Sequence, residues 1–439
     1  MQDLKGRRIG LVLSGGGAKG AYHIGCLKAL RAAGIDRFAA IAGSSVGAIN
    51  AVCAATGRLD TAERAWRALG PFDVVRLRFR DAWRLPLWIV AALGSEFSPF
   101  KISRLSDRVG TRAAGWLHPT ICAAFAAVLW ALGRLLPPPF AAWSSNAAIA
   151  PLVLGGLTLL HRWTRPVFLR PVFTDSTPLA DALGRLISPE QLHELREGGI
   201  PVYGVLSQRD PTVYEAHRWG GWTPRYVRLD RERDVQSLCR TLLDGSAVPG
   251  FLGAGSSAGR TVLDGAWTDN MPAAPLLFGG YDLDAIIVIY LKQTVRHTPR
   301  YNSLWALTEL LVRDAFGRRS KADLHEWARI RWTAYRSSSA ASGQHVATVR
   351  DTCAAPVLIP VAPTGRIGNF FTGTLWFSRA KSASLIDAGE RDMRTALEQL
   401  ATRDTRRDIP EAVPRPALAS RGRSILRALW PLSGGAAAE

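Results

Sequence analysis

The sequence has few cysteines and few lysines. Its five cysteines are scattered over 439 residues without a C-x-x-C pair, which argues against a disulfide framework and against a zinc site. We therefore expect a reducing compartment and no bound metal. Only seven lysines accompany the net charge of +19, so arginine carries the excess. Such an excess more often reflects a GC-rich genome than a nucleic-acid groove, but it also draws a chain toward anionic lipid.

The chain also lacks the marks of a disordered or secreted protein. Hydrophobic residues make up 47% of it, which excludes a disordered or fibrous chain. The N-terminal residues MQDLKGRR lead directly into a short apolar run at 9–13 and a glycine loop. We therefore expect no secretory leader and an N-terminus that is part of the fold.

Apolar runs and turn residues predict alternating strands and helices at the start of the chain. The expected order is a strand at 9–13, a helix at 21–33, a strand at 38–42 and a helix at 48–55. This alternation favours a parallel sheet covered by helices. Further strands are expected at 200–206 and 285–291, and further helices at 304–332 and 382–402.

Two long apolar runs interrupt this pattern. Residues 113–133 and 140–160 contain no Lys, Arg, Asp or Glu, and each is long enough as a helix to cross a hydrocarbon layer of roughly 30 Å. We predict a membrane-spanning helical hairpin, with a buried helical pair or a lid over the active site as the alternative. Arginines flank the hairpin and only Arg134 lies in its turn, which places the globular part in the cytoplasm.

The segment GSSVG at 43–47 fits the pattern G-x-S-x-G. In this pattern a sharp strand-to-helix turn lifts the serine hydroxyl off the backbone and aims the helix N-terminus at developing negative charge. We predict Ser45 as a nucleophile, with Gly43 and Gly47 as the glycines of its elbow. Only one strand and one helix precede the strand that delivers Ser45, whereas an α/β-hydrolase places several strands before its nucleophile. This order argues against the ordinary Ser-Asp-His hydrolase fold.

The segment GGGAKG at 15–20 follows the first expected strand. Successive small residues let backbone N–H groups converge on an anion at a helix start. Dinucleotide binding is less favoured, because no acidic residue ends the second strand. A Walker A loop fails because Gly20 follows Lys19. The favoured interpretation is an oxyanion loop, in which Lys19 either adds positive charge or lies in solvent. Its residues are Gly15, Gly16, Gly17 and Lys19.

A serine nucleophile needs a base, and none of the eight histidines lies in an informative motif. The best candidate is Asp264, which follows an apolar pair and precedes Gly265. Asp-Gly is also common in plain turns, so a structural role is the alternative.

The three segments together resemble the patatin-like phospholipase family, with GGGAKG as oxyanion loop, GSSVG as nucleophile elbow and DGA as the turn of a catalytic aspartate. Ala266 stands where a second glycine is more frequent. Similar features continue around this turn, in SAVPGF at 246–251 and DGAWTDNMP at 264–272. The resemblance covers about residues 8–68 and 173–291, with a weaker similarity at 376–391.

The resemblance implies a three-layer α/β fold with a central, mostly parallel sheet. The apolar hairpin is an insertion that does not belong to the core of this family. It also implies a Ser-Asp dyad, in which Ser45 attacks an ester and Asp264 takes its proton without a cofactor. The implied substrates are acyl esters of membrane phospholipids or lysophospholipids. The hairpin and the basic charge place the site near an anionic membrane surface, and we expect no nucleic-acid partner. A triglyceride lipase or acyltransferase on the same dyad, or a non-catalytic membrane scaffold, are the alternatives.

We expect five parts along the chain. Residues 1–75 and 171–292 form the two halves of the core, 76–170 the insertion with the hairpin, 293–402 a helical region that completes the core, and 403–439 a basic, disordered tail.

Overall fold

The computed structural model describes the greater part of the expected core. The described residues are 4, 6–70, 72–74, 76–77, 114–135, 146–149, 151–152, 155–156, 174–209, 222–248, 252, 255–257, 260–291, 356–368 and 370–402. The helix expected at 304–332, most of the second apolar run at 140–160 and the tail at 403–439 lie outside these residues. The five-part division of the chain stays a prediction.

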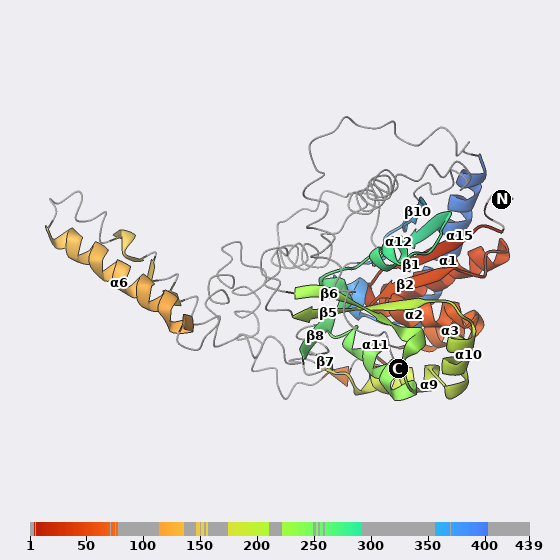
Figure 1. Cartoon of the computed structure of the whole chain (residues 1–439), viewed down its shortest axis with the longest axis horizontal. Helices are drawn as coiled ribbons and strands as arrows, with labels where there is room; N and C mark the ends of the chain where they lie inside the picture. Colours follow the sequence, from red (N-terminus) through yellow and green to blue (C-terminus); the bar gives the residue numbers. More distant parts are fainter. Residues whose placement is uncertain are drawn as a thin grey trace, which may run out of the picture.

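A mixed, eight-stranded sheet forms the centre of the fold (Figure 1). Its order is β10-β9-β1-β2-β5-β8-β7. Strand β6 pairs with the edge of β5 opposite to the one along which β2 and β8 pair. The pairs from β10 to β5 are parallel, whereas β6, β7 and β8 are paired in antiparallel fashion. The strands are β1 (Ile9–Leu13), β2 (Ala40–Ser44), β5 (Val202–Arg209), β6 (Trp222–Arg228), β7 (Gly255–Ser257), β8 (Arg260–Asp264), β9 (Ala285–Ile289) and β10 (Val357–Val361), with β3 (Arg76–Leu77) and β4 (Thr174–Asp175) forming a separate pair.

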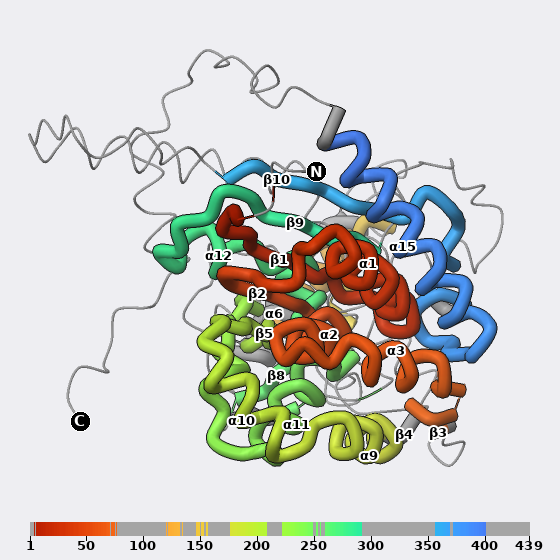
Figure 2. The backbone as a smooth tube through the Cα atoms, turned by 90° about the vertical axis from the view of Figure 1, so that its right-hand side faces the viewer, coloured from red at the N-terminus to blue at the C-terminus, as the bar shows by residue number. Residues whose placement is uncertain are grey.

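Helices cover the sheet, and α1, α2, α3 and α15 gather over one face of it (Figure 2). Successive side chains of a strand point to opposite faces, so β1 sends Leu11 and Leu13 into the core beneath these helices. Val12 packs on the other face with Leu276 and Leu277 of α12. The helices are α1 (Ala21–Ala32), α2 (Val46–Ala55), α3 (Leu59–Ala68), α6 (Ala114–Leu135), α9 (Thr177–Leu186), α10 (Pro189–Glu197), α11 (Val235–Asp244), α12 (Ala274–Phe278) and α15 (Arg379–Thr402). The predicted three-layer α/β fold with a mostly parallel sheet is confirmed.

The C-terminal helix α15 packs closely on α1, far from it in the sequence. A Cβ atom on Gly25 would meet the backbone of α15, and one on Gly389 would meet the carbonyl oxygen of Tyr22. The thiol of Cys26 donates a hydrogen bond to the carbonyl of Gly389 at 3.3 Å. Glycine at each crossing point therefore lets the two backbones approach each other.

Helix α6 coincides with the first predicted apolar helix at 113–133 and lies apart from the sheet (Figure 1). In the described part of the chain, however, no helix combines the length and the apolar character that crossing a membrane requires. His118 and Arg134 fall within α6, and ionisable side chains are unfavourable in hydrocarbon. The structure therefore does not support the predicted transmembrane helix, and the helical hairpin is not shown.

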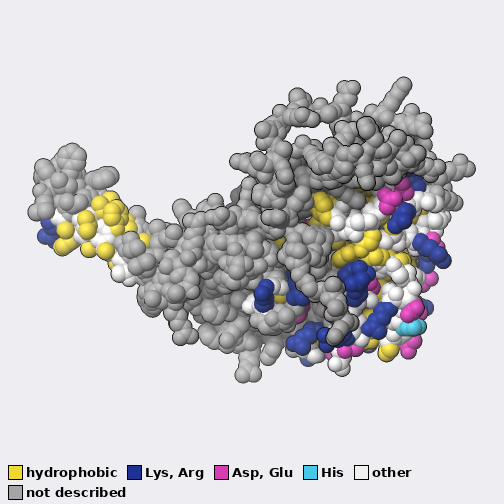
Figure 3. Space-filling model, viewed as in Figure 1, with side chains coloured by type: hydrophobic (Ala, Val, Ile, Leu, Met, Phe, Trp, Pro, Cys, Tyr) yellow, Lys and Arg dark blue, Asp and Glu magenta, His cyan; other side chains and the backbone are white. Residues whose placement is uncertain are grey.

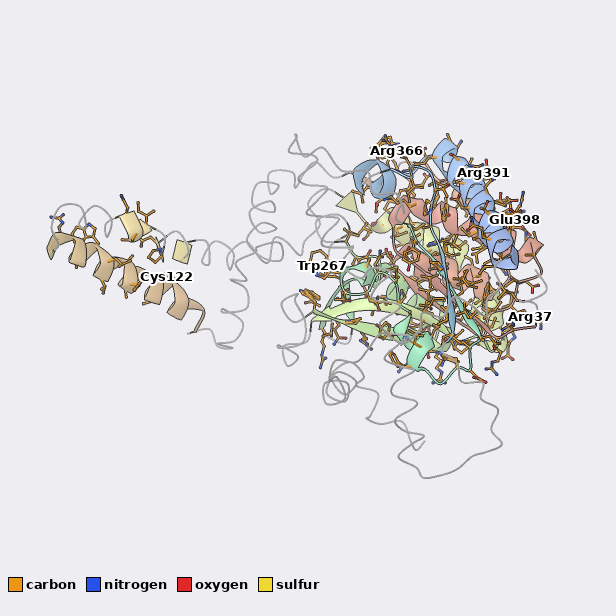
Figure 4. All side chains as sticks on the ribbon, turned by 90° about the horizontal axis from the view of Figure 1, so that it is seen from above. Arg37, Cys122, Trp267, Arg366, Arg391 and Glu398 are labelled. Atoms are coloured by element: carbon orange, nitrogen blue, oxygen red, sulfur yellow. The ribbon has the colours of Figure 1, made fainter. Side chains whose placement is uncertain are left out.

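The two sides of α6 differ in their exposure. Cys122, labelled on this helix in Figure 4, is buried, as is Ala126. Phe125, Val128 and Trp130 are 56%, 54% and 52% exposed. Apolar side chains on α6 are thus divided between a packed side and an open one.

Candidate active site

Two strands end next to each other along β5. Strand β2 runs parallel to β5, and its last residue, Ser44, pairs with Val205. Strand β8 runs antiparallel to β5, and its last residue, Asp264, pairs with Leu206. Since β6 pairs along the opposite edge of β5, β2 and β8 share one edge. The sheet therefore brings Asp264 next to Ser45, the residue that follows β2.

The turn from β2 into α2 is strained at Ser45. Its φ of 52° is the one positive φ at a non-glycine residue among the described residues. A Cβ on Gly43 would meet the backbone of Gly47, and a Cβ on Gly47 would meet the carbonyl of Leu13. Both positions require glycine, and this local chemistry explains why the G-x-S-x-G pattern could be found in the sequence. Strain of this kind collects at functional sites.

The Ser45 hydroxyl donates a hydrogen bond to Oδ2 of Asp264 at 2.7 Å. The other carboxylate oxygen, Oδ1, accepts the backbone N–H of Ala266 at 2.7 Å. Ser45 is 8% exposed and Asp264 2%. Burial raises the pKa of Asp264 from 3.8 to about 6, and the two hydrogen bonds counteract part of that rise. A carboxylate of higher pKa is a better acceptor for the serine proton.

The backbone of Asp264 is held on both sides. Its N–H donates to the carbonyl of Ala247 at 3.0 Å. Its carbonyl accepts the hydroxyl of the buried Ser207 at 2.7 Å, and that hydroxyl lies 2.8 Å from Oγ1 of Thr268. The carboxylate thus projects from a turn whose main chain has little freedom.

The glycine loop between β1 and α1 lies against this pair. Ser14 is fixed to β9, since its N–H donates to the carbonyl of Ile289 at 3.1 Å. The N–H of Gly15 donates to Oδ1 of Asn270 at 2.9 Å and to its carbonyl at 3.3 Å. Within the described residues, the N–H groups of Gly16 and Gly17 have no acceptor. Because the N–H of Gly15 is already bonded, Gly15 holds the loop to Asn270, and the assignment of this loop to an oxyanion stays a prediction.

A C-terminal segment covers the far side of the glycine loop. A Cβ on Gly17 would meet the backbone of the π-helical segment Phe370–Leu375. The half-buried side chain of Lys19 lies against Gly373 through its Cε, so it does not extend freely into solvent. Lys381 donates to the carbonyl of Gly373 at 3.1 Å, and burial lowers the pKa of this lysine to about 8. Sequence patterns gave no sign of this cover.

A buried polar cluster lies behind the elbow and fixes α2 to neighbouring helices. Asn50 donates through Nδ2 to the carbonyl of Gly20 at 2.9 Å and accepts the indole N–H of Trp66 at 3.1 Å. Nδ1 of His23 lies 3.3 Å from the Asn50 amide nitrogen. Burial lowers the pKa of His23 to about 3, so this histidine is neutral and packs in the core.

Comparison with known proteins places this site in a family. The model of the family described as patatin-like phospholipase matches residues 11–277, which include the glycine loop, the elbow and the turn of Asp264. The chain belongs to the patatin-like phospholipase family. Strands β9 and β10, the segment Phe370–Leu375 and α15 lie beyond the matched residues.

Individual proteins are similar to this chain over very different lengths. Uncharacterised proteins of the NTE family from Mycobacterium bovis and Mycobacterium tuberculosis are 43% identical over 70 residues, which is 16% of this chain and 19% of theirs. The chain thus matches about a fifth of the length of these curated relatives. The crystal structure of VipD from Legionella pneumophila aligns with 90% of this chain and 67% of its own, at 18% identity and a TM-score of 0.33.

Proposed function

We propose that the chain is a serine-dependent acyl hydrolase of lipid esters, acting on phospholipids or lysophospholipids. The hydrogen bond of 2.7 Å between Ser45 and the buried Asp264 carries this proposal. Membership of the patatin-like phospholipase family supports a lipid ester as substrate. The dyad joins a hydroxyl, held at a strained elbow, to a carboxylate whose pKa is raised by burial.

In the first step, Oγ of Ser45 forms a bond to the ester carbonyl carbon and passes its proton to Oδ2 of Asp264. The carbonyl oxygen becomes an oxyanion, which accepts the N–H groups of Gly16 and Gly17. The N-terminus of α2, directly after Ser45, adds favourable positive potential. A donor of this kind contributes roughly 3 to 4 kcal/mol to stabilising the transition state in a comparable protease site.

In the second step, the bond to the leaving alcohol breaks and Asp264 returns the proton to the alcohol oxygen. The product is an acyl ester on Ser45. A water molecule then gives a proton to Asp264 and attacks the acyl carbon. Collapse of this second intermediate releases the fatty acid, and Asp264 returns the proton to Oγ of Ser45.

We also propose that the chain meets its substrate at an anionic membrane surface. The exposed residues Phe125, Val128 and Trp130 on α6 offer apolar side chains to such a surface, and Figure 3 shows apolar side chains gathered on this helix. The guanidinium of Arg134 lies 4.6 Å from the ring centre of Trp130. Residues 108–174 contain six arginines and neither aspartate nor glutamate. Aromatic and cationic side chains together are typical of segments that lie in a lipid interface.

The catalytic proposal is tested with Ser45→Ala and Asp264→Asn. Ser382→Ala, another buried serine, and Asp244→Asn, another carboxyl whose pKa is raised to about 6 by burial, are the matched controls. We expect both dyad variants to lose at least about 1,000-fold in kcat/KM for fatty-acid release, while the controls stay within about twofold of wild type. Undiminished hydrolysis in either dyad variant would remove the mechanism.

The same enzyme preparation distinguishes the substrates. Phospholipid, lysophospholipid and triacylglycerol are offered side by side, with and without an acceptor alcohol. We expect the phospholipids to be cleaved fastest; transfer of the acyl group to the alcohol would indicate an acyltransferase. A fluorophosphonate probe should label wild type and not Ser45→Ala. A wild type that is neither labelled nor active would indicate a non-catalytic scaffold.

Membrane binding is tested separately by sedimentation with phosphatidylglycerol vesicles and with phosphatidylcholine vesicles. We expect Phe125→Ser to weaken binding to the anionic vesicles and Phe72→Ser, a phenylalanine 61% exposed elsewhere, to leave it unchanged. Equal binding of both variants would refute the contribution of α6.

A further inference from the structure

Asn270 lies on the same turn as Asp264 but is hydrogen-bonded to the glycine loop between β1 and α1. Its Oδ1 accepts the N–H of Gly15 at 2.9 Å, and its carbonyl accepts the same N–H at 3.3 Å. The turn begins with the short 3-10 helix Gly265–Trp267, whose Trp267 is labelled in Figure 4. One residue thus connects two segments that are 255 positions apart in the chain.

The neighbour of Asn270 holds this turn in place. Asp269 is 1% exposed, and its Oδ2 accepts the hydroxyl of Tyr226 at 2.7 Å. Its Oδ1 accepts the N–H of Met271 at 3.2 Å. Asn270 is therefore presented to the glycine loop from a backbone that is fixed from behind.

Gly15 itself lies against Ser45 and against Ala266, which is on the turn of Asp264. A Cβ added to Gly15 would be 3.2 Å from Cβ of Ser45 and 3.1 Å from Cβ of Ala266. A rotation of the Gly15 peptide would therefore displace the next two amides relative to the serine oxygen. A displacement of about 1 Å at a reacting centre can cost about 100-fold in rate.

We propose that Asn270 is a positioning residue for the oxyanion site. By binding the N–H of Gly15, it orients the loop so that the N–H groups of Gly16 and Gly17 face the oxygen that develops charge. Because the same turn carries Asp264, the proton acceptor and the oxyanion donors keep a fixed relation to each other. This inference rests on the proposed acyl hydrolase function of the site.

The test compares wild type with Asn270→Ala, which removes the side-chain acceptor, and Asn270→Asp, which keeps one. Thr364→Ala is the control, since it removes a side-chain hydrogen bond of 2.7 Å to Asp392 outside the site. Initial rates are measured with a soluble ester over a range of pH. Hydrogen exchange of the Gly15 amide is followed in all four proteins.

We expect Asn270→Ala to lower kcat about tenfold and to change KM less than about twofold, because the backbone carbonyl of Asn270 still holds the loop weakly. The pH midpoint of kcat/KM should not move, since the surroundings of Asp264 are unchanged. Exchange at Gly15 should quicken in Asn270→Ala but not in Asn270→Asp or in Thr364→Ala. A merely structural role would lower stability without separating kcat from KM.

The outcomes separate this inference from the proposed function. If wild type hydrolyses esters and Asn270→Ala matches it in kcat, the positioning role is refuted. If wild type has no activity, the proposed function fails, and the exchange measurement alone decides. Unchanged protection of Gly15 in Asn270→Ala would then overturn the inference, and faster exchange would support only its structural part, that Asn270 holds the glycine loop.

Discussion

Lowering the pH should reduce activity by protonating Asp264. In the proposed mechanism the carboxylate takes the proton of Ser45 only in its ionised form, and burial raises its pKa to about 6. At pH 5 only about 9% of such a group is ionised, so kcat/KM should be about tenfold below its plateau, and at pH 4 about 100-fold. If the pKa of Asp264 had its ordinary value of 3.8, kcat/KM at pH 5 would still be about 90% of its plateau.

The assay is kcat/KM for an uncharged soluble ester from pH 4 to pH 8, so that the substrate does not titrate. Circular dichroism at each pH establishes that the enzyme remains folded. A midpoint near 4 would refute the view that burial controls this carboxyl. Asp244→Asn is the control, because its midpoint should coincide with that of wild type.

The same burial should affect stability in the opposite direction. Because the pKa of Asp264 is higher in the folded state than in the unfolded state, its contribution to stability is complete below about pH 4 and is lost as the pH rises through 6. At roughly 1.4 kcal/mol per pKa unit, the loss is about 3 kcal/mol. Relative to wild type, Asp264→Asn should therefore gain about 2.4 kcal/mol of unfolding free energy between pH 4 and pH 8, because part of the loss has already occurred at pH 4. Urea titrations at both pH values measure it, and a constant difference would contradict the linkage.

Three further changes address strain, close packing and the buried polar cluster. Ser45→Gly should raise the unfolding free energy by about 1 kcal/mol while abolishing hydrolysis, because glycine accepts a positive φ without strain; thermal melting and ester assays measure both. Gly389→Ala should lower the unfolding free energy by about 1 to 3 kcal/mol, since its methyl group would meet the α1 backbone; urea unfolding measures the loss. Asn50→Ala should cost about 2 to 3 kcal/mol in the same assay, because it leaves the buried indole N–H of Trp66 without its acceptor.

The sequence correctly predicted those elements whose geometry is determined mainly by residues close to one another in the chain. Gly43 and Gly47 mark the elbow because a side chain at either position would strike backbone within the same motif or in β1. The strand at 9–13 and the helix after the glycine loop follow from short apolar runs. Local chemistry was sufficient there.

Contacts between residues that are far apart in the sequence could not be predicted from local patterns. The N–H of Gly15 binds Oδ1 of Asn270, a residue that no local sequence pattern connects to the glycine loop. The cover formed by Phe370–Leu375 lies outside the residues that carry the family resemblance. The apolar run at 113–133 forms a helix as predicted, but run length alone overstated its suitability for hydrocarbon.

Strands β2 and β8 both pair with β5, so β5 sets the spacing between the ends of these two strands. Ser44 and Asp264 pair with Val205 and Leu206, so a single residue step of about 3.3 Å sets the spacing of the two strand ends. The chain can lengthen greatly between Ala68 and Thr174 without altering that step. We expect one residue added inside β5 to disturb the spacing of Ser45 and Asp264 more than a hundred residues added between Ala68 and Thr174.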